Sequence, residues 1–361
     1  MDLFAGCGGL TLGLAEAVHI YGLKLQIDLA VDFEEAATAV YKANFPEAIV
    51  STQAVEKHFD GLIGEPLTSV ELALRAEIGS PDFLLGGPPC QGHSNLNNHT
   101  RRKDPKNKLY LLMARAAEVL RPKYVIIENV PSVRRDTAGV VENTISHLES
   151  LGYDVASATV GLNALGVAQK RKRHVVLASL HGDLDSTSIL SNLTERSPET
   201  SWDLTWAIAD LENIDVRNGY DALPNANATN RSRINYLFEN DAYDLPNDQR
   251  PLCHQDGQHS YKSMYGRLRW DQPAQTITSG FGSIGQGRYV HPGSRRALTA
   301  HEAARIQGFP DYFSFSSVLR RGDLSTMIGN AVPPALMLEL GKLLVPRTIA
   351  LDDEIDAGEA A

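Results

Sequence analysis

Short apolar segments alternate with longer amphipathic segments over the first 180 residues, and this alternation is the feature that most constrains the fold. Four short segments are apolar enough to be buried strands: 25–32, 83–87, 124–130 and 174–179. Between them, residues 10–22 and 108–120 place apolar side chains at helical spacing. Strands that alternate with helices of this length predict an α/β fold with a doubly wound, mostly parallel sheet.

The composition and periodicity of the sequence change beyond Leu180. Up to about residue 265 the chain is polar, rich in Asn, Asp and Arg, and without clear periodicity. We therefore expect residues 1–180 to form the main domain, completed by about 325–350, and residues 181–324 to form a smaller, irregular domain. Residues 351–361 are an acidic tail, which we expect to be solvated and frayed.

The last hundred residues again contain clear signals of helices. Thr299 is a helix N-cap with Glu302 as its capping-box partner, and Gly308 followed by Pro310 marks the end of that helix. Residues 330–344, "NAVPPALMLELGKLL", predict an amphipathic helix that is opened by prolines. The "HEAAR" segment lacks the second histidine of a zinc-binding HExxH motif, so we expect no metal there.

Cysteine content and hydropathy bear on the cellular compartment. The three cysteines are far apart and include no CxxC pair, which argues against a disulfide framework or a structural zinc site. The first residues, "MDLFAGCGGL", show no basic region and no long apolar run of a signal peptide. No apolar stretch approaches the roughly 20 residues of a membrane span. We expect a cytoplasmic protein.

The distribution of charge matters more than its total. A formal net charge of −10 does not by itself indicate a polyanion-binding protein. Basic residues nevertheless cluster in 99–108, "HTRRKDPKNK", and in 169–173, "QKRKR". Local patches of this kind can bind phosphate groups while the rest of the surface stays acidic.

The segment "GGPPCQGHS", residues 86–94, places Cys90 on a rigid loop directly after the strand predicted at 83–87. The two glycines end the strand, and Pro88 and Pro89 fix the backbone as it leaves. Open α/β sheets bind their ligands at the carboxyl ends of the strands, where this thiol would lie. The alternative is a small buried hydrophobic residue, which is what most free cysteines are.

The opening segment "DLFAGCGGLTLGL" predicts a short strand, a glycine-rich turn and a helix. Backbone N–H groups at a helix N-terminus suit a nucleotide-like ligand, although the dinucleotide fingerprint GxGxxG is absent. Asp32 follows the next strand, where a carboxylate can accept ribose hydroxyls, and Phe33 can lie against an adenine ring. A tight turn and a surface acid are the alternative for each feature alone, but together they favour an adenosyl cofactor.

Glu128 stands at the tip of an otherwise apolar strand. Burial there would raise the pKa of its carboxyl and make it a proton donor, unless it is a structural or capping residue. In "QKRKR", the alternating residues Gln169, Arg171 and Arg173 share one face if the segment is extended. Such a row can hold a phosphate or a base edge, while a solvated run of charge is the alternative.

Six segments, in this order, resemble the motifs of the cytosine-5 DNA methyltransferases over nearly the whole chain. They are "DLFAGCGG", "GGPPCQGHS", "ENV", "QKRKR", the stretch from "RLRWDQPAQTIT" to "RALTAHEAARIQGFPDYF", and "IGNAVPP". The resemblance implies a Rossmann-like class I methyltransferase domain with a smaller DNA-recognition domain. It further implies S-adenosylmethionine as methyl donor and double-stranded DNA as substrate, with the target-recognition region at about 181–265.

The resemblance also assigns residues. Cys90 would be the nucleophile that attacks C6 of cytosine, Glu128 would act at N3, and Arg171 and Arg173 would hold the base and its phosphate. The cofactor residues would be Phe4, Gly6, Cys7, Gly9, Asp32, Phe33 and Asn330, with Cys7 only a small wall residue. The DNA or substrate contacts would be Pro89, Gln91, Ser94, Gln169, Arg101 and Arg102. No metal is implied, and a monomer that works beside a cognate restriction endonuclease, or alone, is expected.

The chain departs from the family pattern at three places. Only Met1 precedes Asp2, Ser51-Thr52-Gln53 replaces a Gly-Asp pair, and His93 replaces a bulky apolar residue. A tRNA cytosine-5 methyltransferase shares the same fold, but no Cys-Phe-Thr signature surrounds Cys253. A catalytically silent DNA-binding relative would not need Cys90 and Glu128, and a nicotinamide oxidoreductase would carry GxGxxG.

Overall fold

The computed structural model of the chain describes residues 1–89, 109–180, 185–197, 202–212, 219–255, 263–318 and 320–359. The chain divides into two compact units. The first comprises Met1–Leu165, Lys172–Ser197 and Val332–Ala361, and the second comprises Gly166–Arg171 and Pro198–Ala331. Each unit has its own hydrophobic core.

The first unit is built on a seven-stranded sheet with the strand order β3-β2-β1-β4-β5-β8-β6. Its strands are β1 (Asp2–Leu3), β2 (Ala30–Val31), β3 (Val50–Ser51), β4 (Phe83–Gly86), β5 (Tyr124–Asn129), β6 (Asp154–Gly161) and β8 (Lys172–Ser179). Strands β1 to β5 run parallel, and β8 pairs antiparallel with both β5 and β6. Because the strand order reverses between β1 and β4, the sheet is doubly wound, which confirms the predicted fold class.

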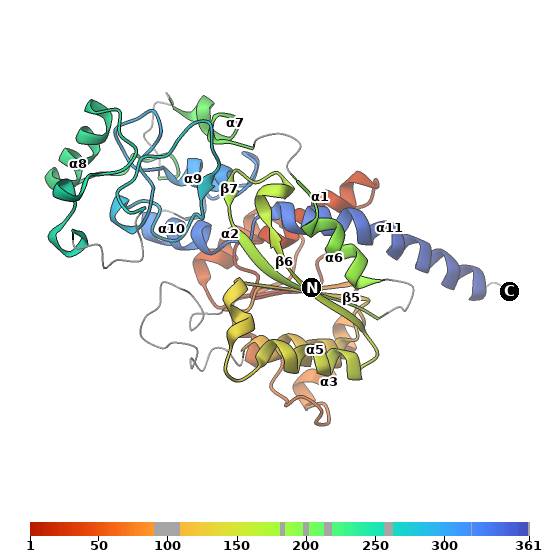
Figure 1. The fold of residues 1–361 in the computed structure, drawn as a ribbon. Coiled ribbons are helices and arrows are strands. Elements are labelled where there is room, and N and C mark those ends of the chain that lie inside the picture. Colours follow the sequence, from red (N-terminus) through yellow and green to blue (C-terminus); the bar gives the residue numbers. More distant parts are fainter. Residues whose placement is uncertain are drawn as a thin grey trace. The chain divides into compact units, whose positions relative to one another are not determined.

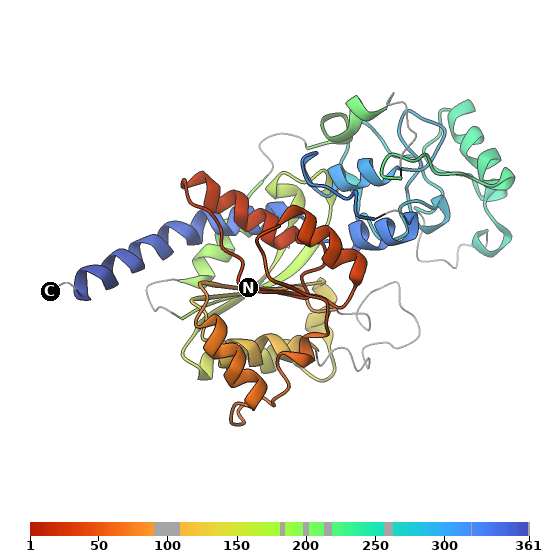
Figure 2. The ribbon, with the colours of Figure 1, turned by 180° about the vertical axis from the view of Figure 1, so that it is seen from behind.

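Helices cover both faces of this sheet, as Figures 1 and 2 show. One face carries α1 (Gly9–Ile20), α6 (Ser186–Thr194) and α11 (Pro334–Glu359), and the other carries α3 (Ser69–Ile78), α4 (Leu111–Leu120) and α5 (Val140–Ser150). Helix α2 (Glu35–Asn44) connects β2 to β3. The main core lies on the α3, α4 and α5 face, where Leu84, Ile127 and Val176 of the sheet meet Met113 and Ala117 of α4.

Helices α1 and α11 pack unusually closely. A Cβ atom at Gly13 of α1 would lie 2.0 Å from the carbonyl oxygen of Pro334, so only glycine fits at this crossing. The expectation that no apolar stretch approaches the length of a membrane span is wrong for the segment Arg321–Ala350, which passes by length and composition. More than half of its most apolar part is buried within the described structure, as in a core helix. The predicted helix opened by prolines is confirmed, since α11 begins at Pro334.

The strands predicted at 83–87 and 124–130 are present as β4 and β5, whereas the predicted strand at 25–32 contracts to Ala30–Val31. Strand β6 was not predicted because "DVASATVG" has few large apolar residues and seven of its eight residues are only half-buried or exposed at the sheet edge. The acidic segment expected to be frayed continues α11 as far as Glu359.

The second unit contains little regular sheet. Its strands β7 (Gln169–Lys170) and β9 (Ala274–Gln275) are two residues each, and its helices are α7 (Leu204–Ile208), α8 (Ala228–Glu239), α9 (Ala300–Ile306) and α10 (Arg321–Asn330). The predicted capping box is confirmed: Thr299 and Glu302 bond reciprocally at the start of α9. Helices α6, α7 and α8 lie in the stretch that the sequence indicated as irregular. They were not predicted because this stretch has no clear apolar periodicity; what marks their first turns is the N-caps Asp185, Asp203 and Asn227.

Candidate active site

The carboxyl ends of the parallel strands β1, β2, β4 and β5 meet at one edge of the sheet in the first unit. The residues that follow these strands include Phe4, Asp32 and Gly87. Glu128 is the second-to-last residue of strand β5. The sequence placed its candidate residues at strand ends, and the parallel pairing brings those ends together. This edge is therefore the place to look for a binding site.

The glycine-rich turn after β1 is held by a carboxylate from β2. The backbone N–H of Gly6 donates to Oδ2 of Asp32 at 2.8 Å, and the N–H of Glu34 donates to Oδ1 at 2.9 Å. Gly6 and Gly8 have φ angles of 54° and 94°, in the left-handed region that glycine adopts without strain. A Cβ atom at Gly8 would lie 2.8 Å from the ring of Phe45, so no larger residue fits there.

The turn leads directly into α1, whose first residue is Gly9 and whose N-cap makes no side-chain hydrogen bond. The first N–H groups of the helix are thus left for a ligand, and the helix dipole favours an electronegative group at this end. Each oxygen of Asp32 keeps a second lone pair, so the carboxylate can still accept hydroxyl groups, and burial raises its pKa. The side chain of Phe33 is 57% exposed, which leaves its ring open to stacking.

Glu128 and Arg173 form a buried ion pair on the central strands. Nε of Arg173 contacts Oε1 of Glu128, and the side chains are only 8% (Glu128) and 11% (Arg173) exposed. Burial lowers the pKa of Arg173, and the charge of Glu128 opposes that shift. The other carboxylate oxygen of Glu128 would lie 3.4 Å from a Cβ atom at Gly87, so it faces the loop that follows β4.

A neighbouring side chain anchors this loop. Nδ2 of Asn129 donates to the carbonyl oxygen of Pro88 at 3.1 Å, while Oδ1 of Asn129 accepts from the N–H of Val130 at 2.7 Å. Pro88 is buried and Pro89 half-buried. The backbone is therefore fixed at Pro88, two residues before Cys90. Cys90 itself lies outside the described residues. Sequence reasoning did not single out Asn129, although its place next to Glu128 on the strand end was a signal.

Comparison with known proteins gives this arrangement its context. Residues 1–345 match the family described as C-5 cytosine-specific DNA methylase. The chain belongs to this family. It is 45% identical over 338 residues to the Type II methyltransferase M1.BsuMI of Bacillus subtilis (strain 168), which covers 93% of this chain and 77% of that protein. It is 29% identical over 355 residues to the Type II methylase M.HgiDII of Herpetosiphon aurantiacus, with 93% and 92% covered.

Solved structures agree on the fold. The Dnmt2 methyltransferase of S. pombe superposes with a TM-score of 0.64 at 16% identity, over 96% of this chain and 98% of that one. The chain is thus an enzyme of the DNA cytosine-5 methyltransferase family with a class I methyltransferase sheet. The expected family resemblance and the expected class of enzyme are both confirmed.

The methylase has two cysteines, Cys7 and Cys90, in its first hundred residues. Cys7 lies on the glycine-rich turn, is 2% exposed, and burial raises the pKa of its thiol to about 12. A thiol with such a pKa stays protonated and is a poor nucleophile. That Cys7 is a small wall residue of the cofactor site stays a prediction. Five other predicted residues lie outside the described residues: Cys90, Gln91, Ser94, Arg101 and Arg102.

Gln169 and Arg171 hold the second unit together from within. Gln169 has no exposed surface; Nε2 donates to the side chain of Gln307 at 2.6 Å, and Oε1 accepts from the N–H of Ile277 at 3.0 Å. Arg171 is 2% exposed and donates to the carbonyl oxygens of Ile277 at 2.8 Å and Ala331 at 3.1 Å. The alternating residues of "QKRKR" do share a buried face, but burial gives Gln169 an internal role in place of the expected contact with DNA.

The remaining predicted residues have simple positions. Asn330 is the last residue of α10 in the second unit and is exposed. At the position where the family Gly-Asp pair was expected, Oγ of Ser51 bonds Nε2 of His58 at 2.9 Å and Oγ1 of Thr52 bonds Oγ1 of Thr38 at 2.9 Å. These hydroxyl groups brace the chain after β3 rather than offering a carboxylate to a ligand.

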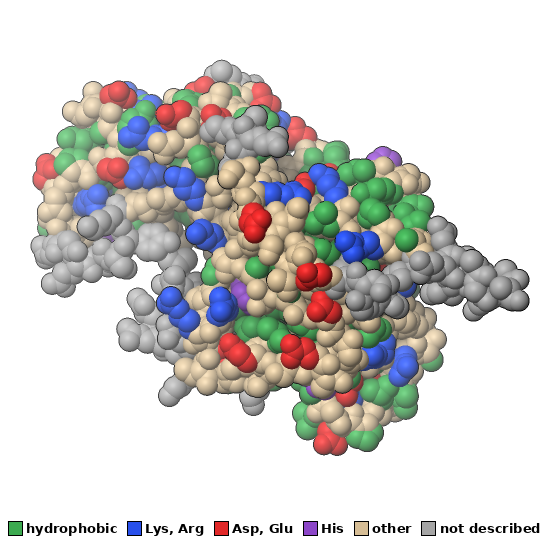
Figure 3. Space-filling model, turned by 45° about the vertical axis from the view of Figure 1, so that its right-hand side comes forward, with side chains coloured by type: hydrophobic (Ala, Val, Ile, Leu, Met, Phe, Trp, Pro, Cys, Tyr) green, Lys and Arg blue, Asp and Glu red, His purple; other side chains and the backbone are tan. Residues whose placement is uncertain are grey.

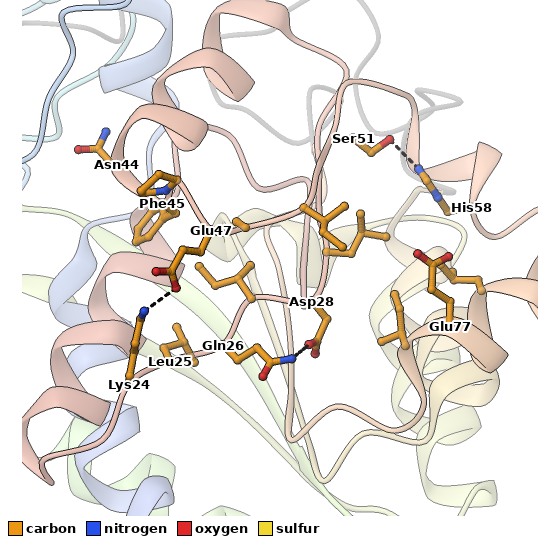
Figure 4. A pocket seen from close by; sticks show the side chains of 17 residues that line it. Lys24, Leu25, Gln26, Asp28, Asn44, Phe45, Glu47, Ser51, His58 and Glu77 are labelled. Carbon is orange, nitrogen blue, oxygen red and sulfur yellow. Dashed lines mark hydrogen bonds and ion pairs between the residues drawn. The ribbon is translucent and has the colours of Figure 1, made fainter.

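A cavity of about 1080 Å³ lies elsewhere in the first unit, along the segments that lead into β2 and β3 (Figure 4). Its lining combines apolar residues such as Leu25 and Ile49 with an ion pair between Lys24 and Glu47 at 2.5 Å. It includes none of the predicted site residues. The chemistry assigned to the strand ends therefore does not involve this cavity.

Proposed function

We propose that the chain transfers a methyl group from S-adenosylmethionine to C5 of cytosine within a specific sequence of double-stranded DNA. The observation that carries this proposal is the buried Glu128–Arg173 pair beside the anchored Pro88-Pro89 loop that leads to Cys90. Membership of the DNA methylase family supplies the class of reaction. The pair supplies a positioned carboxyl group at the point where the chain presents its candidate nucleophile.

The chemistry needs both residues because C5 of cytosine is a weak nucleophile. The thiolate of Cys90 adds to C6, and Glu128 donates a proton or a hydrogen bond at N3, so that C5 gains the electron density of an enamine. After methylation at C5, loss of the C5 proton and elimination of the thiolate restore the aromatic ring. A rigid loop holds the sulfur near its reacting carbon and so contributes through orientation.

Arg173 and Asn129 act as positioning residues in this scheme. Arg173 fixes the carboxyl group of Glu128 through a contact that is largely shielded from water. Asn129 ties the loop carbonyl of Pro88 to the strand that carries Glu128. Asn129 is the neighbour of Glu128 on β5, so the carboxyl group and the anchor of the Pro88 carbonyl share one strand end.

The residues of the glycine-rich turn fit S-adenosylmethionine. The open N–H groups at the start of α1, the acceptor positions left on Asp32, and the exposed ring of Phe33 match an adenosine with a charged amino-acid chain. A Cβ atom at Gly6 would contact nothing, so the surface beside Phe4 and Cys7 is open to a ligand. The cofactor supplies an electrophilic methyl group on sulfur, and the family motif alone assigns Asn330 to cofactor binding.

The substrate assignment extends to the rest of the chain. C6 is hidden in stacked DNA, so the target cytosine must leave the duplex, and we assign Gln91, Ser94, Arg101 and Arg102 to contacts around it. The region of about 181–265 is proposed to recognise the target sequence. The 45% identity to a Type II methyltransferase supports a role beside a cognate restriction endonuclease. We further propose that the protein works in the cytoplasm as a monomer.

Nucleoside mass spectrometry tests the proposal. Purified protein is incubated with S-adenosylmethionine and either mixed-sequence duplex DNA or total tRNA, with a Cys90→Ser variant in parallel. We expect 5-methylcytosine in DNA with the native protein only. Methylation confined to tRNA would refute the substrate assignment, and methylation that survives in the variant would refute the role of Cys90.

A further inference from the structure

Several arginines of the second unit have their charge matched by a carboxylate. Arg267 pairs with Asp241 at 3.4 Å, Arg295 pairs with Glu239 at 3.2 Å, and Arg288 pairs with Asp244. Two of these side chains also bond backbone oxygens: Nε of Arg267 donates to Pro292, and NH1 of Arg288 donates to Tyr243. Such arginines hold the unit together and have few donors to spare for a ligand. Figure 3 shows Lys and Arg side chains interspersed with acidic ones on the visible face.

Arg269 differs from these neighbours. Its side chain is exposed, and its guanidinium carbon lies 3.7 Å from the ring centroid of Tyr243. Among the residues that the structure describes, it has neither a carboxylate partner nor a hydrogen-bond acceptor. Its five N–H donors are therefore directed to solvent, at a site where the flat face of the guanidinium is already occupied by a ring.

Tyr243 is itself a firmly held support. Its carbonyl oxygen accepts from the N–H of Arg267 at 2.9 Å and from NH1 of Arg288 at 2.7 Å. The guanidinium of Arg267 also lies over the same ring, at 5.2 Å from its centroid. Because the ring is fixed from the backbone side, Arg269 loses less conformational freedom when it binds than a free surface arginine would.

We propose that Arg269 is a specificity-determining residue that reads a guanine in the target sequence, with Tyr243 as its positioning residue. A guanidinium whose plane is set by stacking presents two parallel donors, which match O6 and N7 of guanine in the major groove. A phosphate contact requires only a positive charge and gains little from a fixed plane. This inference rests on the proposed function, since it presupposes methylation of duplex DNA.

The test is a methylation assay on duplex DNA that is randomised around cytosine, with the methylated products sequenced. For the native protein we expect a required guanine at one position. Both Arg269→Ala and Arg269→Lys should reduce discrimination at that position by about 5-fold to 150-fold, because lysine keeps the charge but not the fork. Tyr243→Phe should preserve discrimination because the ring remains, and Tyr243→Ala should weaken it at the same position.

Arg295→Ala is the matched control, because Arg295 is also exposed but is paired with Glu239. It should leave the sequence preference unchanged. If Arg269→Ala lowers methylation uniformly over all sequences and reduces the salt dependence of binding, the residue contacts phosphate and the inference is overturned. An unchanged sequence preference also overturns it. If the native protein methylates no duplex at all, the proposed function itself fails, a result distinct from the two above.

Discussion

The buried polar side chains around the candidate site of the first unit and those inside the second unit have different partners. At the candidate site of the first unit, the buried charges of Glu128 and Arg173 pair with each other on the neighbouring strands β5 and β8. In the second unit the backbone is irregular, and Gln169, Arg171 and Arg288 donate to carbonyl oxygens that no strand satisfies. Where secondary structure is sparse, polar side chains supply hydrogen bonds to the backbone, and Arg269 differs because no acceptor within the described structure holds it.

The largest effect is expected in the first unit. Glu128→Gln should lower the single-turnover rate of methylation by about 10²-fold to 10⁴-fold, because the proton donor is removed while the shape is kept. The rate is measured at saturating DNA and corrected for the folded fraction. A loss below 10-fold would show that the buried pair is structural, as Arg171 is in the second unit.

In the second unit, substitution of Arg171 should lower the free energy of unfolding. Arg171→Met leaves the carbonyl oxygens of Ile277 and Ala331 buried without their donors, so we expect a loss of about 3–5 kcal/mol in the free energy of unfolding. Urea denaturation measures it. The same substitution at Arg231, which is exposed and bonds only at 3.3 and 3.4 Å, should cost less than about 1 kcal/mol. Equal losses of unfolding free energy in the two variants would contradict the structural role of Arg171.

Two buried histidines offer a pH-dependent comparison. Burial lowers the pKa of both His174 and His291 to about 4, below the ordinary value of 6.5. The unfolded chain then binds more protons than the folded one between these values. Stability is therefore complete above about pH 6.5 and falls as the pH drops toward 4, by roughly 3 kcal/mol for each residue.

Their surroundings separate the two histidines. Both ring nitrogens of His174, in the first unit, lack hydrogen-bond partners within the described structure, while Nδ1 of His291 accepts from the N–H groups of Gly293 at 3.0 Å and Ser294 at 2.8 Å. His174→Leu should remove acid sensitivity at little cost near neutral pH, whereas His291→Leu should destabilise at every pH. Denaturation at pH 5 and pH 7.5 measures this, and equal behaviour of the two variants would contradict it.

The smallest effect is expected at the surface of the second unit. Glu239→Gln breaks the exposed pair with Arg295, and we expect at most about 1 kcal/mol, reduced further by salt. Thermal unfolding at low and high ionic strength checks this. A larger loss of stability that persists at high salt would mean that exposed ion pairs also stabilise the second unit.

Local features could be predicted from the sequence, and distant contacts could not. The strands β4 and β5 and the capping box of α9 depend on neighbouring residues, so pattern and spacing revealed them. A second capping box, of Thr68 and Glu71 at the start of α3, carried the same signal and was missed. The antiparallel pairing of β8 depends on β5 and β6, which no local pattern specifies.

The candidate site divides in the same way. Glu128 was found because a carboxylate stands out in an apolar strand. The burial of Gln169 was not, because its partners Ile306 and Ile277 lie more than 100 residues away in the chain. Likewise, the anchoring of Pro88 by Asn129 joins residues 41 positions apart. Residue type and order indicated the chemistry, but only the packed structure distinguishes a group that reacts from one that supports.

The most direct test of the proposed chemistry is covalent trapping on duplex DNA that contains 5-fluorocytosine at the target position. Fluorine replaces the C5 proton, so elimination of the cysteine is blocked after methylation. We predict a protein–DNA adduct that survives denaturing gel electrophoresis, requires S-adenosylmethionine, and maps to Cys90 by peptide mass spectrometry. An adduct at another residue, or methylation of ordinary DNA without any adduct, would contradict the assignment of Cys90 as the nucleophile.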